Sequence, residues 1–596
     1  MTSLATERLL ASVRTFALDD PDPSTREYLL AHASEAHLVL LDELFAAPLQ
    51  FGTAGLRAPL GAGPARMNRS VVARATAGVC GHLRSHWPDL DAPSLCIGYD
   101  ARHGSLEFAR EAAAVALGQG LTVYMFRAPD PTPLLAYAVR KLAAQAGIMV
   151  TASHNPPEYN GFKVYNERGA QLHSPADQAV SHYMGQVHTV LGLPRKPPEP
   201  QTAGFHWLPD TVITDYLAAL PQLHRPQEHA PVPTPRIAYT AMHGVAGRLC
   251  HAALSRAGFV HTFLEPSQFA PDPDFPTVRF PNPEEPGALA KALALGESLE
   301  ADLVLANDPD GDRLAVAARN AAGQLQALTG NDLGILLADA LLAQAQAQGV
   351  ERPLLCYTLV STPLAARIAA HYSARAELTL TGFKWICNRS LDLEAQGHHF
   401  VFGFEEALGY ALGQAVRDKD GIAAALVTAQ LAARCAEQGH TLIDQLEQLC
   451  RRHGCFVSSQ HALVREGREG QAAIATALQR LRTDPPSQIA GHPVVAIHDL
   501  ANPPPPAASS TPAGLQALPP SNVLVLELAP NLRICLRPSG TEPKLKMYFD
   551  VIEPLASGED LNTARARLQA PLPALATALV AQLGLDDGSP GPSTDS

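Results

Sequence analysis

The sequence predicts an α/β protein with three similar α/β domains and a smaller C-terminal α+β domain. Short β-rich runs alternate with alanine- and leucine-rich helical runs, as in SLCIGYD (94–100) followed by SLEFAREAAAVALGQG (105–120). This strand–helix alternation is typical of parallel sheets covered by helices. The pattern returns around PRIAYTAM (235–242) and LLCYTLV (354–360), which gives three α/β segments.

The last part of the chain differs, because its strand-like runs have few helices between them. These runs are PVVAIHDL (493–500), NVLVLEL (522–528), LRICLRP (532–538) and KLKMYFDVI (544–552). They predict a small α+β domain. The proline-rich stretch LGLPRKPPEPQTAG (191–204) suggests a domain boundary. We therefore predict domains at 1–208, 209–322, 323–440 and 441–596.

Composition narrows the class of protein. With 596 residues the chain is too long for one core, and 46% apolar with 17% charged residues fits a folded protein. The net charge of −13 argues against a nucleic-acid partner. Nine cysteines without a C-x-x-C pair indicate a reduced, cytoplasmic chain. The charged N-terminus and the lack of a long apolar stretch predict neither a signal peptide nor a membrane span.

The first chemical loop is TASHNP (151–156), which follows the apolar run AGIMV (146–150). Ligands of open α/β sheets collect at the C-terminal ends of strands, so Ser153 is a candidate nucleophile there. A plain serine turn is the alternative. The G-x-S-x-G elbow of α/β-hydrolases is absent. Lys163 could add positive charge nearby, or could be a solvated side chain.

The second loop is NDPDGDR (307–313), in which Asp308, Asp310 and Asp312 alternate. Alternate side chains of an extended segment share a face, and a divalent cation would relieve the repulsion of three carboxylates. Oxygen ligands favour Mg²⁺, Mn²⁺ or Ca²⁺ over zinc. An EF-hand is excluded, because Arg313 stands where its glycine is needed and Arg319 where its glutamate is needed.

Two further loops contain groups that suit a phosphosugar. Glu405 and Glu406, in GFEEALGY (403–410), stand between an aromatic strand and an expected helical run. They either accept hydrogen bonds from sugar hydroxyls or favour a helix N-terminus through its dipole. In RPSGTEPK (537–544), an arginine, a hydroxyl-rich turn and a lysine form a candidate anion site, and the alternative is an ordinary turn between strands.

Taken in this order, the four loops resemble those of the α-D-phosphohexomutase superfamily, which contains phosphoglucomutases and phosphomannomutases. Further stretches agree, namely FGTAGLR (51–57), GYDARHGS (98–105), YTAMHGVAG (239–247), TGFKW (381–385) and RDKDG (417–421). The resemblance covers roughly residues 45–552 and is strongest to the long phosphoglucomutase branch that includes phosphopentomutases. It implies that the four domains surround a central active-site cleft.

The resemblance also implies roles for individual residues. Ser153 would be phosphorylated, and its phosphate would bind one Mg²⁺ together with Asp308, Asp310 and Asp312. The transferring phosphoryl group would be surrounded by Arg57, His154, Lys163 and Arg313, and one or more of Arg57, His154 and Lys163 would move protons. The sugar hydroxyls would be held by Glu405 and Glu406, and the sugar would be oriented by a loop with Lys384 and Trp385. The non-reacting phosphate would be bound by Arg537, Ser539, Gly540, Thr541, Lys544 and Lys419.

The implied reaction interconverts α-D-glucose 1-phosphate and glucose 6-phosphate, with glucose 1,6-bisphosphate as intermediate and activator. Phosphomannomutase and phosphopentomutase remain alternatives, although Ala407 stands where many phosphomannomutase-type members have serine. The partners are small-molecule sugar phosphates. A phosphatase of the haloacid-dehalogenase type would use Asp308 as nucleophile, but Asp312 stands where that motif needs Thr or Val. A non-catalytic sugar-phosphate-binding protein is the third hypothesis.

Overall fold

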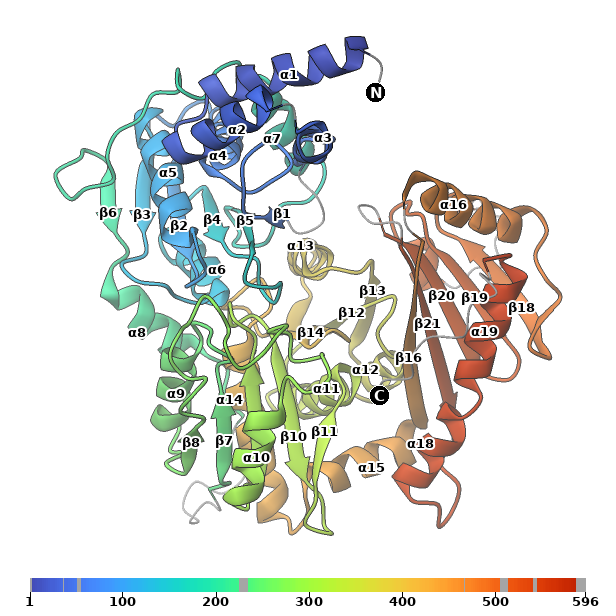
Figure 1. The fold of residues 1–596 in the computed structure, drawn as a ribbon. Coiled ribbons are helices and arrows are strands. Elements are labelled where there is room, and N and C mark those ends of the chain that lie inside the picture. Colours follow the sequence, from blue (N-terminus) through green and yellow to red (C-terminus); the bar gives the residue numbers. More distant parts are fainter. Residues whose placement is uncertain are drawn as a thin grey trace. The chain divides into compact units, whose positions relative to one another are not determined.

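The computed structural model of the chain is shown in Figure 1, coloured from the N-terminus in blue to the C-terminus in red. It describes residues 3–35, 37–50, 55–223, 234–465, 467–503, 513–539 and 544–585. The elements form two units. The first contains Met1–Ala318, Gly382–Leu391 and Leu408–Ala433, and the second contains Arg319–Thr381, Asp392–Ala407 and Arg434–Ser596.

The first sheet of the first unit has six strands in the order β1-β5-β4-β2-β3-β6. Strand β2 pairs in parallel with β3 and β4, whereas β5 runs antiparallel to β4 and β1. Every residue of β4 is buried, because a central strand has covered faces on both sides. The bounds are β1 Leu56–Pro59, β2 Ser94–Tyr99, β3 Thr122–Met125, β4 Ala146–Val150, β5 Tyr159–Asn166 and β6 Phe205–Trp207.

Helices α4 to α7 pack around this sheet, and three further helices precede it. The three N-terminal helices share a small core of their own, which includes Val13, Leu29 and Leu41. The bounds are α1 Ser3–Leu18, α2 Pro23–Ser34, α3 Leu38–Phe45, α4 Arg69–His86, α5 Ser105–Gly118, α6 Thr132–Lys141, α7 Ala176–Gly185 and α8 Asp210–Ala219.

A second sheet of the same unit carries the acidic loop. The four strands of this sheet that belong to the first unit run in the order β10-β9-β7-β8, with β9 parallel to β7 and antiparallel to β10. The bounds are β7 Ile237–Thr240, α9 Gly247–Arg256, β8 Thr262–Leu264, α10 Ala290–Ser298, β9 Leu303–Asn307 and β10 Leu314–Arg319. The later segments of this unit add β15 (Gly409–Leu412) and all but the last residues of α13 (Phe383–Glu394) and α14 (Gly421–Glu437).

The second unit begins with an α/β sheet in which β12 pairs in parallel with β13 and β14. The helices and strands in this part of the second unit, of which β11 is not a strand of that sheet, are β11 Leu325–Leu328, α11 Gly330–Ala347, β12 Pro353–Thr358, α12 Leu364–His371, β13 Arg375–Thr379, β14 His399–Glu405 and α15 Leu442–His453.

The C-terminal part of the second unit is an antiparallel sheet in the order β16-β21-β20-β19-β18-β17, with helices packed against it (Figure 1). The predicted combination of α/β sheets and a terminal α+β sheet is confirmed. The bounds are β16 Cys455–Val464, α16 Gly467–Thr483, β17 Gln488–Ile489, β18 His492–Asp499, α17 Ala513–Gln516, β19 Leu524–Leu528, β20 Leu532–Pro538, β21 Lys544–Glu553, α18 Leu561–Gln569 and α19 Leu572–Gln582.

Three local expectations were wrong. The segment after Glu405 was expected to be helical, but it turns at Leu408, whose φ is +58°, and continues as strand β15. Lys384 and Trp385 were expected in a loop and lie in the first turn of α13. The stretch 191–204 does not separate two sheets, because β6 follows it and pairs with β3. The proposed domain limits at 208, 322 and 440 stay predictions.

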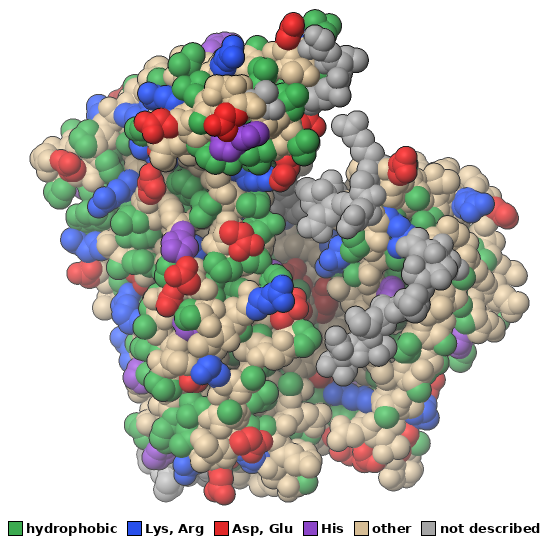
Figure 2. Space-filling view, in the orientation of Figure 1, with side chains coloured by type: hydrophobic (Ala, Val, Ile, Leu, Met, Phe, Trp, Pro, Cys, Tyr) green, Lys and Arg blue, Asp and Glu red, His purple; other side chains and the backbone are tan. Residues whose placement is uncertain are grey.

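Two further features concern the charges on the surface and the apolarity of the helices. On the face drawn in Figure 2, acidic and basic side chains are interspersed. Among the described residues, none of the helices combines the length and apolarity that a membrane crossing requires.

Candidate active site

Ser153 lies in the loop between β4 and β5, as predicted, and its side chain is buried. Its backbone adopts a left-handed conformation with φ +53°, and its N–H donates to Thr151 Oγ1 at 2.8 Å. Gly161 permits this geometry, because a Cβ there would lie 2.5 Å from the Thr151 carbonyl oxygen. The Ser153 Oγ thereby lies 3.0 Å from Asp308 Oδ2 and 3.2 Å from His154 Nδ1.

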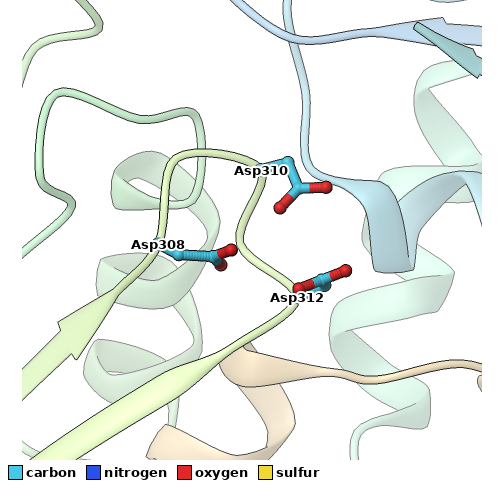
Figure 3. Close-up of side chains that lie close together, drawn as sticks. All are labelled: Asp308, Asp310 and Asp312. Carbon is cyan, nitrogen blue, oxygen red and sulfur yellow. The ribbon is translucent and has the colours of Figure 1, made fainter. Parts of the chain in front are cut away.

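The three aspartates converge at the tight turn between β9 and β10 (Figure 3). All three side chains are fully buried, and one carboxylate oxygen of each lies within 4.8 Å of the others. The segment is not extended as expected from the alternation. Gly311, with φ +73°, closes the turn, and a Cβ at this position would approach Ala246 and Pro131 to 2.9 Å.

Two lysines partly neutralise this acidic cluster. Lys163 Nζ lies 2.8 Å from Asp310 Oδ2 and 3.1 Å from Asp312 Oδ2, and Lys419 Nζ lies 3.2 Å from Asp312 Oδ2. Burial alone would lower the pKa of Lys163, but the neighbouring carboxylates outweigh burial and raise it. Burial also opposes ionisation of Asp310, yet Lys163 and Lys419 hold the pKa of that carboxyl below its usual range.

The cluster retains oxygen atoms that suit a cation. Asp310 Oδ1 and Asp312 Oδ1 are buried and have no hydrogen-bond partner among the described residues. Burial and the charges of Asp310 and Asp312 raise the pKa of Asp308 well above its ordinary value. A divalent cation would stabilise the ionised form of all three carboxylates, and oxygen-only ligands favour Mg²⁺ or a similar hard ion.

The remaining predicted phosphoryl-group contacts lie in the same unit. Arg57, on β1, donates from Nη1 to Asn155 Oδ1 at 2.9 Å. Arg313, which follows the acidic turn, pairs with Glu284 at 2.8 Å. Burial and the positive charges of Arg313, Arg57 and Lys419 lower the pKa of His154 well below its ordinary value. The buried serine hydroxyl thus contacts one carboxylate of the acidic triplet and the imidazole of His154, whose lowered pKa favours its neutral form.

Comparison with known proteins agrees with this geometry. Models of phosphoglucomutase/phosphomannomutase α/β/α domains I, II and III match residues 48–189, 214–323 and 329–453. The chain is 38% identical over 504 residues to a Haemophilus influenzae protein named "Probable phosphomannomutase", covering 84% of this chain and 94% of that protein. The chain belongs to the phosphoglucomutase/phosphomannomutase family. It is therefore a phosphohexomutase-type enzyme, an isomerase that transfers phosphoryl groups.

Other relatives carry different substrate names. A Staphylococcus epidermidis phosphoglucomutase is 34% identical, covering 85% of this chain and 92% of its own. A mouse phosphopentomutase is also 34% identical, covering 90% and 89%. Among solved structures, the Paramecium phosphoglucomutase parafusin has the same fold, with a TM-score of 0.64 at 17% identity, covering 92% of this chain and 98% of its own.

The predicted sugar-binding glutamates of this phosphohexomutase lie in the second unit. Glu405 ends strand β14 and is buried. Glu406 follows it and accepts hydrogen bonds of 3.2 Å from Thr358 Oγ1 and Ser361 Oγ. The Ser361 hydroxyl also accepts the Glu406 N–H at 3.2 Å, so the backbone and side chain of Glu406 are both fixed by the loop after β12.

Three of the predicted phosphate-binding residues, Arg537, Ser539 and Lys544, lie in the second unit where β20 ends and β21 begins. Arg537 is opposite Lys546 near the end of β20, and Ser539 N–H donates to the Lys544 carbonyl at 2.8 Å. The pairing of β20 with β21 therefore brings Arg537, Ser539 and Lys544 to one end of the strand pair. Gly540 and Thr541 lie outside the described residues.

Lys384 and Trp385 do not join the aspartate cluster. Lys384 is buried, and its Nζ lies 3.7 Å from Asp177 Oδ2 of α7 and 5.6 Å from the Trp385 ring centre. Lys384 and Asp177 line a cavity of about 960 Å³ in the first unit. Lys419 was expected to reach a phosphate, and in the protein alone it pairs with Asp312.

Sequence reasoning missed contacts that depend on distant residues. Thr132, at the start of α6, donates from Oγ1 to Asp310 Oδ2 at 2.8 Å and from its N–H to the Asp310 carbonyl at 2.9 Å. The only sequence signal for Thr132 is its position at the start of an expected helix that follows a strand, where ligand-binding residues are common. Glu284, the partner of Arg313, lies in a loop without a recognisable signal.

Proposed function

We propose that this chain is a Mg²⁺-dependent phosphoglucomutase that interconverts α-D-glucose 1-phosphate and glucose 6-phosphate through a phosphorylated Ser153. The observation that carries the proposal is the 3.0 Å approach of the Ser153 hydroxyl to Asp308 in a buried triplet of carboxylates. Two oxygens of that triplet lack hydrogen-bond partners among the described residues, which fits one cation held by Asp308, Asp310, Asp312 and the Ser153 phosphate. When bound, Mg²⁺ supplies Lewis-acid charge that draws electron density from the phosphoryl group.

The reaction would proceed in two transfers at the Ser153 oxygen. In the first, a sugar hydroxyl attacks the phosphorus, the P–Oγ bond of phosphoserine breaks, and glucose 1,6-bisphosphate forms. The bisphosphate turns round, the Ser153 Oγ attacks the phosphorus of the other phosphate, and the P–O bond to the sugar breaks to release the isomeric monophosphate. In each transfer the attacking hydroxyl loses a proton and the leaving oxygen gains one. Of the candidates Arg57, His154 and Lys163, we assign the proton of Ser153 to His154, whose Nδ1 lies 3.2 Å from Oγ.

The charges of the first unit suit this chemistry. A phosphoserine with nearly two negative charges would join three carboxylates, and phosphoryl transfer gains chiefly from positioning and charge compensation. Lys163 and Lys419 contact the aspartates. With Arg57 and Arg313 they supply four positive charges besides the cation. Arg313 would exchange its contact with Glu284 for the phosphoryl group.

We assign sugar recognition and binding of the non-reacting phosphate to the second unit. Glu405 and Glu406 would accept hydrogen bonds from sugar hydroxyls, and the anchoring of Glu406 by Ser361 supports that role. Arg537, Ser539, Gly540, Thr541 and Lys544 would bind the distal phosphate, since arginine and hydroxyl-rich turns suit that anion. Lys384, Trp385 and Lys419 would contact the substrate from the first unit.

The choice of glucose rests on the Staphylococcus epidermidis phosphoglucomutase relative and on Ala407 in the sugar loop. Mannose and pentose phosphates are favoured by the other relatives. The test compares kcat/KM for the 1-phosphates of glucose, mannose, ribose and deoxyribose, with and without glucose 1,6-bisphosphate. The highest value for glucose 1-phosphate is expected. A higher value for another sugar would replace glucose and leave the mutase chemistry intact.

The chemistry itself is tested by locating the phosphate on the protein after incubation with glucose 1,6-bisphosphate and Mg²⁺. Peptide mass spectrometry should find an acid-stable phosphate on Ser153, and Ser153→Ala should carry none and lose turnover. An acyl phosphate on Asp308 would instead support the phosphatase hypothesis. Full turnover by Ser153→Ala would exclude the phosphoserine mechanism.

A further inference from the structure

A buried arginine, Arg102, donates hydrogen bonds to backbone carbonyls of the loop that carries Ser153. Arg102 follows strand β2, and its side chain is only 1% exposed. Its Nη2 donates to the carbonyl oxygens of Ser153, at 2.6 Å, and Asn155. Its Nη1 donates to the carbonyls of Pro156, at 2.8 Å, and Tyr159, at 3.3 Å. One planar guanidinium thus binds three carbonyls of the loop and the carbonyl of Tyr159, the first residue of β5.

These contacts coincide with an unfavourable backbone conformation. Ser153 has φ +53°, which residues other than glycine rarely adopt and which persists only where surrounding contacts fix it. The Ser153 N–H is held by Thr151 Oγ1 at 2.8 Å, and the Ser153 carbonyl is held by Arg102. Hydrogen bonds therefore fix the peptide groups on both sides of the serine.

Arg102 is itself held in place. Its backbone N–H donates to Asp100 Oδ1 at 3.0 Å, and its Nε lies 3.5 Å from Asp100 Oδ2. The Phe275 ring covers the guanidinium, with its centre 4.8 Å from the Arg102 Cζ. Asp100 offsets the positive charge, and the side-chain hydrogen bonds of Arg102 end on backbone carbonyls. These contacts indicate that Arg102 supports the loop backbone and does not bind phosphate.

We propose that Arg102 is a positioning residue, which keeps Ser153 in its left-handed conformation and so holds Oγ beside Asp308. The inference rests on the proposed function, because it assigns Arg102 an indirect part in the phosphorylation of Ser153. Without its hydrogen bonds, the loop relaxes and the serine oxygen leaves the position required for transfer. Substrate binding should change little, because all the side-chain hydrogen bonds of Arg102 go to backbone carbonyls and none goes to a side chain that would hold the sugar phosphate.

The test uses Arg102→Lys, which keeps the charge beside Asp100 but loses the planar fork, and Arg102→Gln, which loses both. The control is Arg110→Gln, an exposed arginine of helix α5. Three quantities are measured: amide hydrogen exchange of peptides spanning 150–160, the single-turnover rate of Ser153 phosphorylation by glucose 1,6-bisphosphate, and the steady-state kcat and KM.

We expect faster exchange in the loop for both Arg102 variants. Phosphorylation and kcat should fall about 10-fold for Arg102→Lys and about 100-fold for Arg102→Gln, because small displacements of a reacting atom have effects of this size. KM should stay within about 2-fold, since the loop carbonyls do not bind substrate. Arg110→Gln should match the wild type in all three measurements.

Two results would overturn the proposal. One is wild-type kcat and phosphorylation in both Arg102 variants. The other is slower phosphorylation with unchanged hydrogen exchange in the loop, which would mean that Arg102 acts on the phosphate itself. If Arg102→Gln does not fold, the same three measurements on Arg102→Lys test the proposal. If wild-type Ser153 takes up no phosphate, the proposed function fails, and the exchange comparison still tests the support of the loop by Arg102.

Discussion

The Ser153 hydroxyl donates a 3.0 Å hydrogen bond to Asp308 Oδ2, although the two residues are 155 positions apart. Ser153 follows β4 of one sheet and Asp308 follows β9 of another, so each residue lies at the C-terminal end of a buried strand. Ligands of open α/β sheets bind at such ends. The contact therefore joins two strand ends into one centre for phosphoryl transfer.

The strained backbone of Ser153 gives the first prediction. Because glycine adopts a positive φ without steric cost, Ser153→Gly should be more stable than Ser153→Ala by about 1 kcal/mol. Both variants should lose turnover. Thermal unfolding measures the stability difference. At Ser181, inside helix α7, the same two substitutions should show the opposite order, because glycine destabilises helix interiors. Equal midpoints for the two Ser153 variants would argue against strain.

Local sequence patterns predicted the positions of the site residues that directly follow a buried strand. The apolar run 146–150 forms β4 and delivers Ser153, and the run before Asp308 forms β9. The convergence of the three aspartates was also predicted, although a Gly311 turn produces it rather than an extended segment. Short motifs at strand ends are informative because the chain leaves a buried sheet at a defined place.

Features set by distant residues could not be predicted. Lys419 contacts Asp312 and Thr132 contacts Asp310, and nothing in their local sequences encodes the pairing. The segment after Glu405 contains alanine and leucine that fit a helix, but tertiary packing places it in strand β15. The local sequence left Lys163 open as a solvated lysine, and only the family resemblance placed it at the phosphoryl group. It is buried, because carboxylates far along the chain compensate its charge.

Metal binding gives the second prediction. Saturating Mg²⁺ should stabilise the wild type by about 3 kcal/mol relative to EDTA if the concentration is about 100 times Kd. Asp308→Asn should be more stable than the wild type in EDTA, since it removes one of three mutually repelling carboxylates, and should gain less from Mg²⁺. Thermal unfolding with and without Mg²⁺ measures both effects, and exposed Asp302→Asn is the control. An unchanged gain in Asp308→Asn would exclude Asp308 as a ligand.

The pH dependence of stability gives the third prediction. Asp420 is buried and accepts hydrogen bonds from Tyr216 Oη, at 3.0 Å, and from the N–H of Ala423, at 2.8 Å. Burial raises its pKa from 3.8 to about 6. The folded protein therefore binds this proton more tightly than the unfolded chain does. Stability from Asp420 is present below about pH 4 and falls by about 3 kcal/mol as pH rises to about 6.

Asp420→Asn isolates this contribution. Asparagine keeps an acceptor for the N–H groups at the start of α14 but has no charge to lose. The loss of stability between pH 4 and pH 6, measured by denaturant unfolding, should be smaller in this variant by about 3 kcal/mol. Parallel profiles of wild type and variant across that range would show that Asp420 ionises normally in the folded protein.

The anchoring of Glu406 gives the last prediction, which concerns sugar recognition. Ser361 is fully buried, and its hydroxyl both donates to Glu406 Oε2 and accepts the Glu406 N–H. Ser361→Ala removes these two bonds and leaves only the one from Thr358 Oγ1, so Glu406 should be held less firmly and KM for glucose 1-phosphate should rise about 10-fold with little change in kcat. Thr476→Ala, on the exposed face of α16, should leave both constants unchanged. A kcat that falls while KM stays constant would assign Glu406 to the chemical step instead of to ground-state binding of the sugar.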